Sequence, residues 1–325
     1  RHTRLRTVTG VQTCALPIYS YNWIAGIDPH INEWDALISF TEFGAYEFIK
    51  AGVRKPISVI PHGLDTKCFY PADKKEARKK LGLDEDLFIC FNGNRNQFRK
   101  RIDITISAFA KFAVNRPDAR LYLHMGLKDQ GWDIMPLFAR EMQKQGLDPN
   151  NRIIMTTNNP NPPDVDTDLL STIYNAADVG INTTKGGGWE LVNFEHAACK
   201  VAQVVPDHTS TKEIFEGHGA LIRCDHIDVD TSFAREMPCP SVDHLTEILS
   251  DLYDDREKLQ DMAERCYNRV TDPDFNWDTV AQDFHRVFQE AMAGTHDDEE
   301  KTIKPIVSIE KKSKRRKGKK NLILT

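Results

Sequence analysis

The strongest constraint on the fold is an alternation of short apolar runs and helix-like stretches that begins near residue 70. The apolar runs have the length and composition of buried parallel strands. Strands are expected at 87–91, 119–124, 152–156, 178–182, 201–205 and 220–222, and helices at 74–81, 101–113, 132–145, 167–177, 189–199 and 211–215, with a final set of helices over 241–293. This pattern predicts an α/β fold with a doubly wound, Rossmann-like parallel sheet.

A glycine-rich stretch follows one of the expected strands. Three glycines at 186–188 come after the apolar run 178–183 and precede a helical pattern that begins at Trp189. Glycines let the backbone approach a ligand closely, and the N–H groups of a helix N-terminus attract anions. Glu195 lies about one and a half turns into this helix, where a carboxylate can accept hydrogen bonds from the hydroxyls of a sugar. A glycine-rich loop with a solvated glutamate is the alternative interpretation.

A second stretch combines a strand end, a glycine turn and a helix start with several bases. Gly93 and Asn94 follow the strand, and Arg95 precedes the basic run 99–101. Cations at a helix N-terminus oppose the helix dipole by roughly 0.3–1 kcal/mol each, so their placement favours an anionic ligand. Arginine can bind phosphate oxygens bidentately and lysine adds a point charge. A solvated basic turn is the alternative.

Both stretches resemble signatures of one family, the retaining glycosyltransferases of the GT-B fold, family 4 type (group 1). Gly188, Trp189, Leu191, Glu195, Ala198 and Cys199 fall in register with its E-G-F-G-L-x-x-x-E and following E-A-x-A-C-G motif. Arg95, Lys100, Ile102 and Asp103 match its G-R-x-x-x-x-K-G-I-D stretch. Residues 170–178 and 275–278 resemble two further motifs, and the resemblance covers about residues 30–293.

The sequence departs from the main signature at four positions. Gly187 replaces its first glutamate, Glu190 replaces its second glycine, and His196 and Lys200 replace a later alanine and glycine. In the family the first glutamate lies near the transferred sugar. We hypothesise that Glu190 reaches the sugar in place of the missing carboxylate. A degenerate module that binds a nucleotide sugar without transferring it is the alternative.

The resemblance implies transfer of a sugar from a nucleotide-diphosphate sugar, with retention of anomeric configuration and without a metal ion or other cofactor. Arg95 and Lys100 would neutralise the leaving diphosphate, and Glu195 would hold the ribose. The implied catalytic residues are Arg95, Lys100 and Glu190, and the implied donor-binding residues are Gly93, Asn94, Arg95, Lys100, Gly186, Gly187, Gly188, Trp189, Leu191 and Glu195. The acceptor, whether glycan, lipid or protein, is not indicated, and a GT-B nucleotide-sugar epimerase is a further alternative.

The resemblance also divides the chain. Residues 8–18 resemble the translation of a sequencing adapter, so 1–18 are expected to be an artefact. Residues 19–60 resemble the last part of an N-terminal acceptor domain, and 61–293 the donor domain. His62 lies at the crossing turn, where it either faces the cleft or simply forms the turn. With most of the acceptor domain missing, this chain alone would not be a competent enzyme.

Charge separates the globular part from the tail. The net charge is −5, yet residues 311–320 alone carry +8, so the remainder carries −13. An acidic globular part argues against a broad nucleic-acid-binding face. The charged tail 294–325 is expected to be disordered, and its basic run could contact an anionic surface, including nucleic acid.

Cysteine usage and hydropathy predict a cytoplasmic protein. The seven cysteines show no metal-ligand spacing, and the sequence Cys224-Asp225-His226 is only a weak metal candidate. Reduced thiols are the simpler interpretation. No run approaches the roughly 18–20 apolar residues of a membrane span, so no transmembrane segment is expected.

Overall fold

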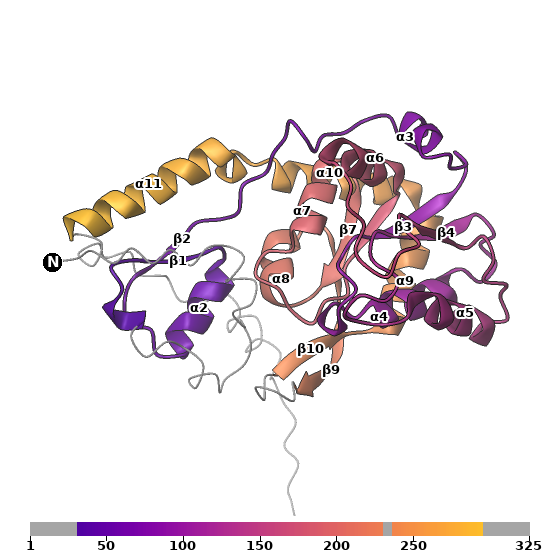
Figure 1. The fold of residues 1–325 in the computed structure, drawn as a ribbon, viewed down its shortest axis with the longest axis horizontal. Coiled ribbons are helices and arrows are strands. Elements are labelled where there is room, and N and C mark those ends of the chain that lie inside the picture. Colours follow the sequence, from indigo (N-terminus) through magenta and orange to yellow (C-terminus); the bar gives the residue numbers. More distant parts are fainter. Residues whose placement is uncertain (1–30, 230–235, 295–325) are drawn as a thin grey trace, which may run out of the picture.

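The computed structural model describes residues 31–229 and 236–294. Figure 1 shows a sheet domain with helices around it and a small N-terminal unit beside it. The proposed adapter segment 1–18, the first part of the proposed remnant 19–60 and the charged tail beyond Gly294 lie outside the described residues.

The sheet domain contains six parallel strands in the order β5-β4-β3-β6-β7-β8. The strands are β3 (Phe88–Asn92), β4 (Ala119–Leu123), β5 (Ile153–Met155), β6 (Val179–Ile181), β7 (Ala202–Pro206) and β8 (Ala220–Ile222). The strand order reverses direction between β3 and β6, which makes this the switch point where ligands of such sheets bind. The predicted doubly wound parallel sheet is confirmed.

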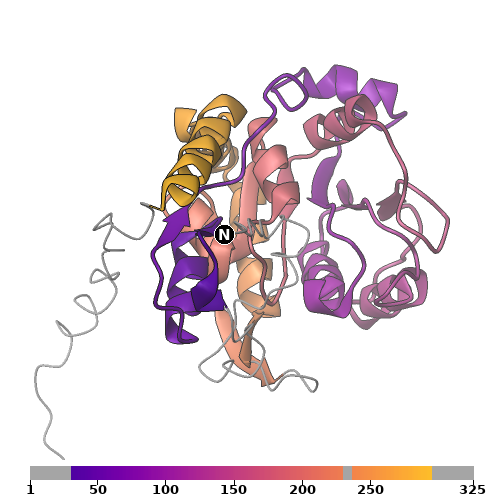
Figure 2. The same ribbon diagram turned by 60° about the vertical axis from the view of Figure 1, so that its left-hand side comes forward.

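Helices cover both faces of the sheet (Figure 2). The helices are α3 (Lys74–Lys80), α4 (Ile102–Phe112), α5 (Ile134–Lys144), α6 (Thr167–Ala176), α7 (Leu191–Ala198), α8 (Thr209–Phe215), α9 (Val242–Asp254) and α10 (Arg256–Val270). Helix α4 packs against α5 and α9, whereas α7 packs against α6 and α10, and α3 packs against α6. All residues of β3 and β7 are buried because helices exclude water from both faces.

The N-terminal unit is small and has its own core. Strand β1 (Leu37–Ser39) pairs in parallel with β2 (Ile57–Val59), and α2 (Glu42–Lys50) connects them. Its buried apolar cluster consists of Ile31, Leu37, Ala45, Val53 and Ile57. The carboxylate of Glu213 on α8 accepts hydrogen bonds from the backbone N–H groups of Glu42 and Phe43, both at 2.9 Å. This contact joins the start of α2 to the sheet domain.

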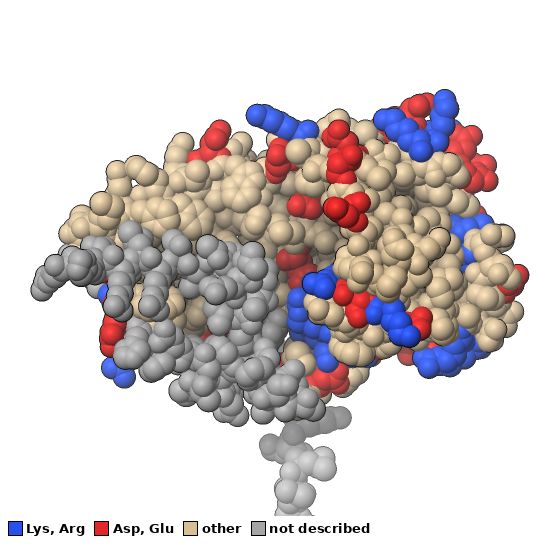
Figure 3. Space-filling model, viewed as in Figure 1, with Lys and Arg blue, Asp and Glu red and all other residues tan. Residues whose placement is uncertain are grey.

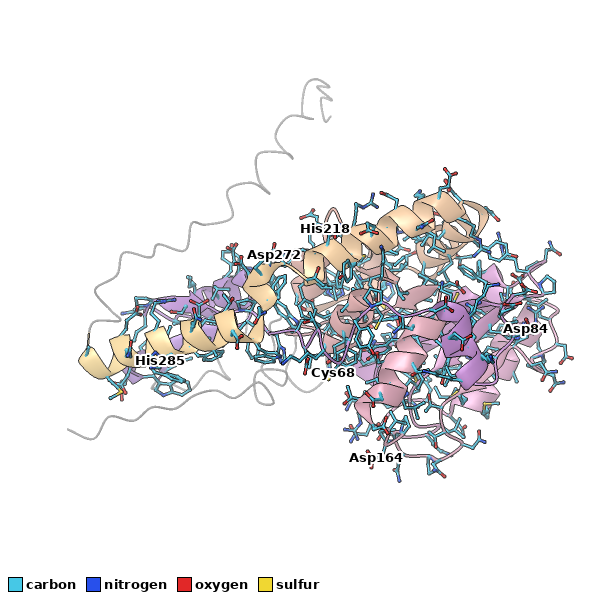
Figure 4. All side chains as sticks on the ribbon, turned by 90° about the horizontal axis from the view of Figure 1, so that it is seen from above. Cys68, Asp84, Asp164, His218, Asp272 and His285 are labelled. Atoms are coloured by element: carbon cyan, nitrogen blue, oxygen red, sulfur yellow. The ribbon has the colours of Figure 1, made fainter. Side chains whose placement is uncertain are left out.

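The last helix, α11 (Trp277–Ala293), returns to the N-terminal unit. Its Val280 and Val287 form a buried cluster with Ile60, and Ile38 of β1 packs against that cluster. In Figure 4 the helix projects away from the sheet domain, with Asp272 near its junction and His285 along its length. The end of the described chain therefore lies beside its beginning.

Two features differ from the expected elements. Helix α7 begins at Leu191 rather than at Trp189, because Glu190 has a left-handed backbone with φ 70°. An antiparallel hairpin of β9 (Cys224–Val229) and β10 (Glu236–Pro240) was not predicted. Prolines in β10 weaken the sequence signal for a strand.

Candidate donor-binding site

The two stretches that the sequence singled out meet at the carboxyl ends of β3 and β6. The backbone N–H of Lys185 donates to the carbonyl oxygen of Arg99 over 2.9 Å, and the Thr183 hydroxyl donates to the carbonyl oxygen of Arg101 over 2.8 Å. Segments 93–101 and 182–190 thus lie against each other at the switch point.

A buried ion pair links the centres of these segments. Lys100 Nζ hydrogen-bonds to Glu190 Oε2, which also accepts a 2.9 Å bond from Asn182 Nδ2, and Arg99 Nη1 lies 3.8 Å from Glu190 Oε1. The Glu190 side chain is only 3% exposed. Burial would raise the pKa of this carboxyl, but the Lys100 and Arg99 cations lower it below its ordinary value of 4.5. Glu190 is therefore held ionised inside the site.

The glycine turn is buried and braced by hydrogen bonds. The Gly186 carbonyl oxygen accepts from Arg99 Nη1 at 2.5 Å and from the Thr184 hydroxyl at 2.9 Å, while the Ser210 hydroxyl donates to the Gly187 carbonyl oxygen at 2.8 Å. Gly188 is also buried. The predicted order of strand, glycine turn and helix is present, but α7 begins at Leu191, two residues later than expected, with the left-handed Glu190 as its N-cap.

The turn after β3 is fixed by an asparagine. The Asn92 side-chain oxygen accepts from the backbone N–H of Asn94 at 2.9 Å and from its side-chain amide at 3.0 Å. A Cβ atom on Gly93 would lie 2.8 Å from the Phe91 ring and 3.0 Å from Val192 Cγ1. Position 93 thus requires glycine because neighbouring side chains approach it closely.

Arg95 and Lys100 have different partners. Arg95 is 49% exposed in its side chain and forms a two-pronged pair with Asp129 in the loop after β4, at 2.5 Å (Nε to Oδ2) and 3.0 Å (Nη2 to Oδ1). Lys100 instead points inward to Glu190. The exposed guanidinium is able to turn toward a ligand, whereas the buried lysine is held in place.

Glu195 on α7 is a second carboxyl group at this site. Its Oε2 lies 3.4 Å from the Tyr174 hydroxyl on α6, and no cation pairs with it among the described residues. Burial raises the pKa of Glu195 to about 7. The group is therefore close to half ionised near neutral pH.

The other predicted site residues flank α7. Leu191 is 38% exposed at the helix start, whereas Trp189 is 4% exposed and packs edge-on against Phe194 and Phe275. The indole N–H of Trp189 is buried without a hydrogen-bond partner among the described residues. Trp189 is a wall of the site rather than an exposed contact surface.

His62 lies at the crossing between the N-terminal unit and the sheet domain. Its ring packs against Phe40 and Trp277, with centroids 5.8 and 5.0 Å away, and its Nδ1 lies 3.0 Å from the Gly63 carbonyl oxygen. Burial lowers its pKa below 6.5. These contacts favour the interpretation of His62 as a residue that forms the turn.

The weak metal candidate at 224–226 lies on the unpredicted hairpin. In the part of the chain that the structure describes, one group of potential ligands comes together, His226, Asp228 and Cys239, and it omits Cys224. Arg101 and Lys185 both donate to Asp228, at 3.2 and 3.1 Å. These cations already occupy the space beside its carboxylate, which disfavours a bound metal ion.

Sequence reasoning missed several residues that build the site. They are Arg99, Asp129, Asn182, Thr183 and Thr184, which link the segments through the contacts described above. Arg99 belongs to the basic run, and the polar triplet at 182–184 directly follows a buried strand, so both carried a usable signal. Asp129 carried none, because nothing in the sequence indicates that it approaches Arg95.

Charges of both signs lie on the face of the molecule shown in Figure 3, where Lys and Arg are interspersed with Asp and Glu over its described part. No helix among the described residues combines the length and apolarity needed to cross a bilayer.

Comparison with known proteins indicates what class of domain this is. A family model described as "Glycosyl transferase-like" matches residues 146–286. D-inositol 3-phosphate glycosyltransferase of Geodermatophilus obscurus is 27% identical over 181 residues, covering 54% of this chain and 39% of the relative. Lipopolysaccharide core biosynthesis mannosyltransferase LpsB of Rhizobium meliloti is 30% identical over 200 residues, covering 56% and 52%. The chain thus spans about half or less of these relatives.

Solved structures share the fold. Sucrose-phosphate synthase of Thermosynechococcus elongatus aligns with a TM-score of 0.63 and 22% identity, covering 80% of this chain and 59% of that one. Anabaena HepE in complex with UDP and glucose aligns with a TM-score of 0.62 and 18% identity, covering 79% and 64%.

Together the sheet and these relatives define a glycosyltransferase-like α/β domain with the GT-B fold. The family model and the curated relatives that this chain resembles are glycosyltransferases.

Proposed function

We propose that this chain is the donor-binding half of a retaining, metal-independent glycosyltransferase of family 4 type that uses a nucleotide-diphosphate sugar. The observation that carries the proposal is the junction of segments 93–101 and 182–190 at the sheet's switch point, where Arg99, Lys100 and Asn182 surround one carboxylate. Anionic ligands of doubly wound sheets bind at such a position. HepE, with a similar fold, is known in complexes with UDP and UDP-glucose.

The proposed roles follow from the chemistry of each side chain. Lys100 and a reoriented Arg95 neutralise the charge that grows on the leaving diphosphate. Glu195 accepts hydrogen bonds from the ribose hydroxyls in its ionised form. The departing phosphate oxygen then guides the acceptor hydroxyl to the same face of the sugar, so that the anomeric configuration is retained.

The remaining partners are also proposals. The acceptor is a glycan, lipid or protein that binds on the side of the cleft to which the N-terminal unit belongs. The protein acts in the cytoplasm, and the basic run 311–320 contacts an anionic surface.

Calorimetric titration of the full chain with UDP, UDP-glucose, GDP and GDP-mannose tests the proposal. Arg95→Ala and Glu195→Ala are each expected to weaken binding about tenfold, because each removes a hydrogen bond that involves a charged group. Arg265→Ala is the matched control, because Arg265 is also exposed (44%) and ion-paired, to Asp261 on α10. That variant should bind like the wild type.

Two results would contradict the proposal. A folded wild-type chain that binds none of the four nucleotides has no donor site of this kind. Binding that is equally weakened in all three variants, or in none of them, places the nucleotide elsewhere.

A further inference from the structure

Glu190 and Gly187 share one position in space. A Cβ atom added to Gly187 would lie 1.7 Å from Glu190 Oε1 and 2.7 Å from its carboxyl carbon. The carboxylate of residue 190 therefore fills the volume into which a side chain on residue 187 would project. The two positions cannot both carry a large side chain unless the Glu190 side chain or the turn shifts.

The backbone at residue 190 is one that glycine adopts more easily than glutamate. Glu190 has φ 70° and ψ 63°, in the left-handed region. A non-glycine residue there is strained and persists only where its surroundings determine it strongly. Those surroundings are the Lys100 ammonium, the Asn182 amide and the Arg99 guanidinium.

The family signature has the reverse arrangement, with glutamate at the position of Gly187 and glycine at the position of Glu190. If glutamate and glycine exchange positions 187 and 190, one carboxylate stays in the same place. Only the backbone position that carries it changes. Because the Glu190 side chain is only 3% exposed, a sugar hydroxyl does not reach it in this structure. Its effect on a ligand passes through Lys100.

We propose that Glu190 supplies, from three residues downstream, the carboxylate that the signature carries at residue 187, and that it is a positioning residue for Lys100 in the diphosphate subsite. The inference rests on the proposed donor-binding function. It replaces the expectation that Glu190 itself contacts the sugar.

The test is an exchange cycle of four full-length proteins: wild type, Gly187→Glu, Glu190→Gly and the double variant. The ratio of UDP to UMP affinity, and of GDP to GMP affinity, isolates the terminal phosphate from the rest of the nucleotide. Each single variant should lower that ratio about tenfold, because Lys100 either meets two carboxylates or loses the Glu190 carboxylate. The double variant should return to within about threefold of the wild type. A general loss of structure would lower both affinities and leave the ratio unchanged.

Melting temperature supplies a readout that needs no ligand. Gly187→Ala should lower the melting temperature in the wild type, where its Cβ meets the Glu190 carboxylate, and have little effect in the Glu190→Gly background. Equal effects in both backgrounds would overturn the shared position.

In the exchange cycle, a double variant whose phosphate ratio is no better than that of the worse single variant would overturn the positioning role. Failure of the wild type to bind any nucleotide would instead refute the donor-binding function, and with it the assigned role.

Discussion

The turn before α7 contains the buried Glu190 and the first turns of α7 contain the half-buried Glu195, and the surroundings of the two carboxyl groups differ. Glu190 lies among Lys100, Arg99 and Asn182, and its pKa is lowered. Glu195 accepts a hydrogen bond from the Tyr174 hydroxyl and has no cation partner among the described residues, and burial raises its pKa to about 7. Burial acts in the same direction on both groups, so the neighbouring cations make the difference.

This contrast separates two kinds of site residue. A buried carboxylate whose charge is already matched by cations belongs to the architecture of the site. A buried carboxyl without a cation partner is costly in the free protein and becomes useful only when a ligand donates hydrogen bonds to it. Glu190 therefore fits a positioning role, and Glu195 fits direct contact with a ligand.

The largest expected effect comes from Glu190→Gln. The substitution leaves Lys100 as a buried charge without its carboxylate, and loss of one partner of a buried pair typically costs about 3–5 kcal/mol. Urea denaturation at pH 7 should show the free energy of unfolding reduced by roughly this amount. A reduction below about 1 kcal/mol would mean that the pair is no more important than a surface pair.

The loss of wild-type stability at acidic pH should depend on the same carboxyl group, Glu190. Because the folded pKa of Glu190 is lowered, its contribution to stability is present above the ordinary pKa of 4.5 and is lost as pH falls through the folded pKa. Denaturation curves of the wild type and Glu190→Gln should therefore converge as the pH drops below 4.5. Parallel curves down to pH 2 would contradict this assignment.

Glu195→Gln should have the opposite sign and a smaller size. Because the folded pKa is raised, stability is fully present below pH 4.5 and is lost as pH rises through about 7. The neutral amide avoids that loss, so the free energy of unfolding at pH 8 should rise by about 1–2 kcal/mol, with no change at pH 4. A destabilised variant at pH 8 would show that Glu195 has a favourable partner in the free protein.

The pH dependence of nucleotide binding sharpens the comparison further. If ionised Glu195 accepts the ribose hydroxyls, affinity for the nucleotide that binds should increase as pH rises through 7, by about tenfold at most. Glu195→Gln should bind more weakly at pH 8 and show a flatter profile. A profile that is identical in wild type and variant would remove Glu195 from the ribose subsite.

The smallest effect is expected from Glu264→Gln on α10. Glu264 pairs with Lys200 at 2.5 Å, but its side chain is 45% exposed. Solvent screens such a pair, so the free energy of unfolding should change by less than about 0.5 kcal/mol. Glu264→Gln and Glu190→Gln remove the same charge at an exposed and at a buried position. The difference between their free energies of unfolding therefore measures the effect of burial.

The sequence by itself determined the sheet and the two stretches that build the site. Strands β3 and β7 were predictable because parallel strands covered on both faces are predominantly apolar. The stretches around Arg95 and Glu195 were predictable because polar and glycine residues directly follow such strands, and the carboxyl ends of parallel strands share one edge.

Only the tertiary structure decided which side chains pair across that edge. Arg95 and Lys100 look equivalent in sequence, yet one meets Asp129 at the surface and the other meets Glu190 inside. The return of α11 to the N-terminal unit likewise leaves no trace in the local pattern. The physical reason is that periodicity and turn chemistry act over a few neighbouring residues. Ion pairing and packing depend instead on distances between residues far apart in the chain.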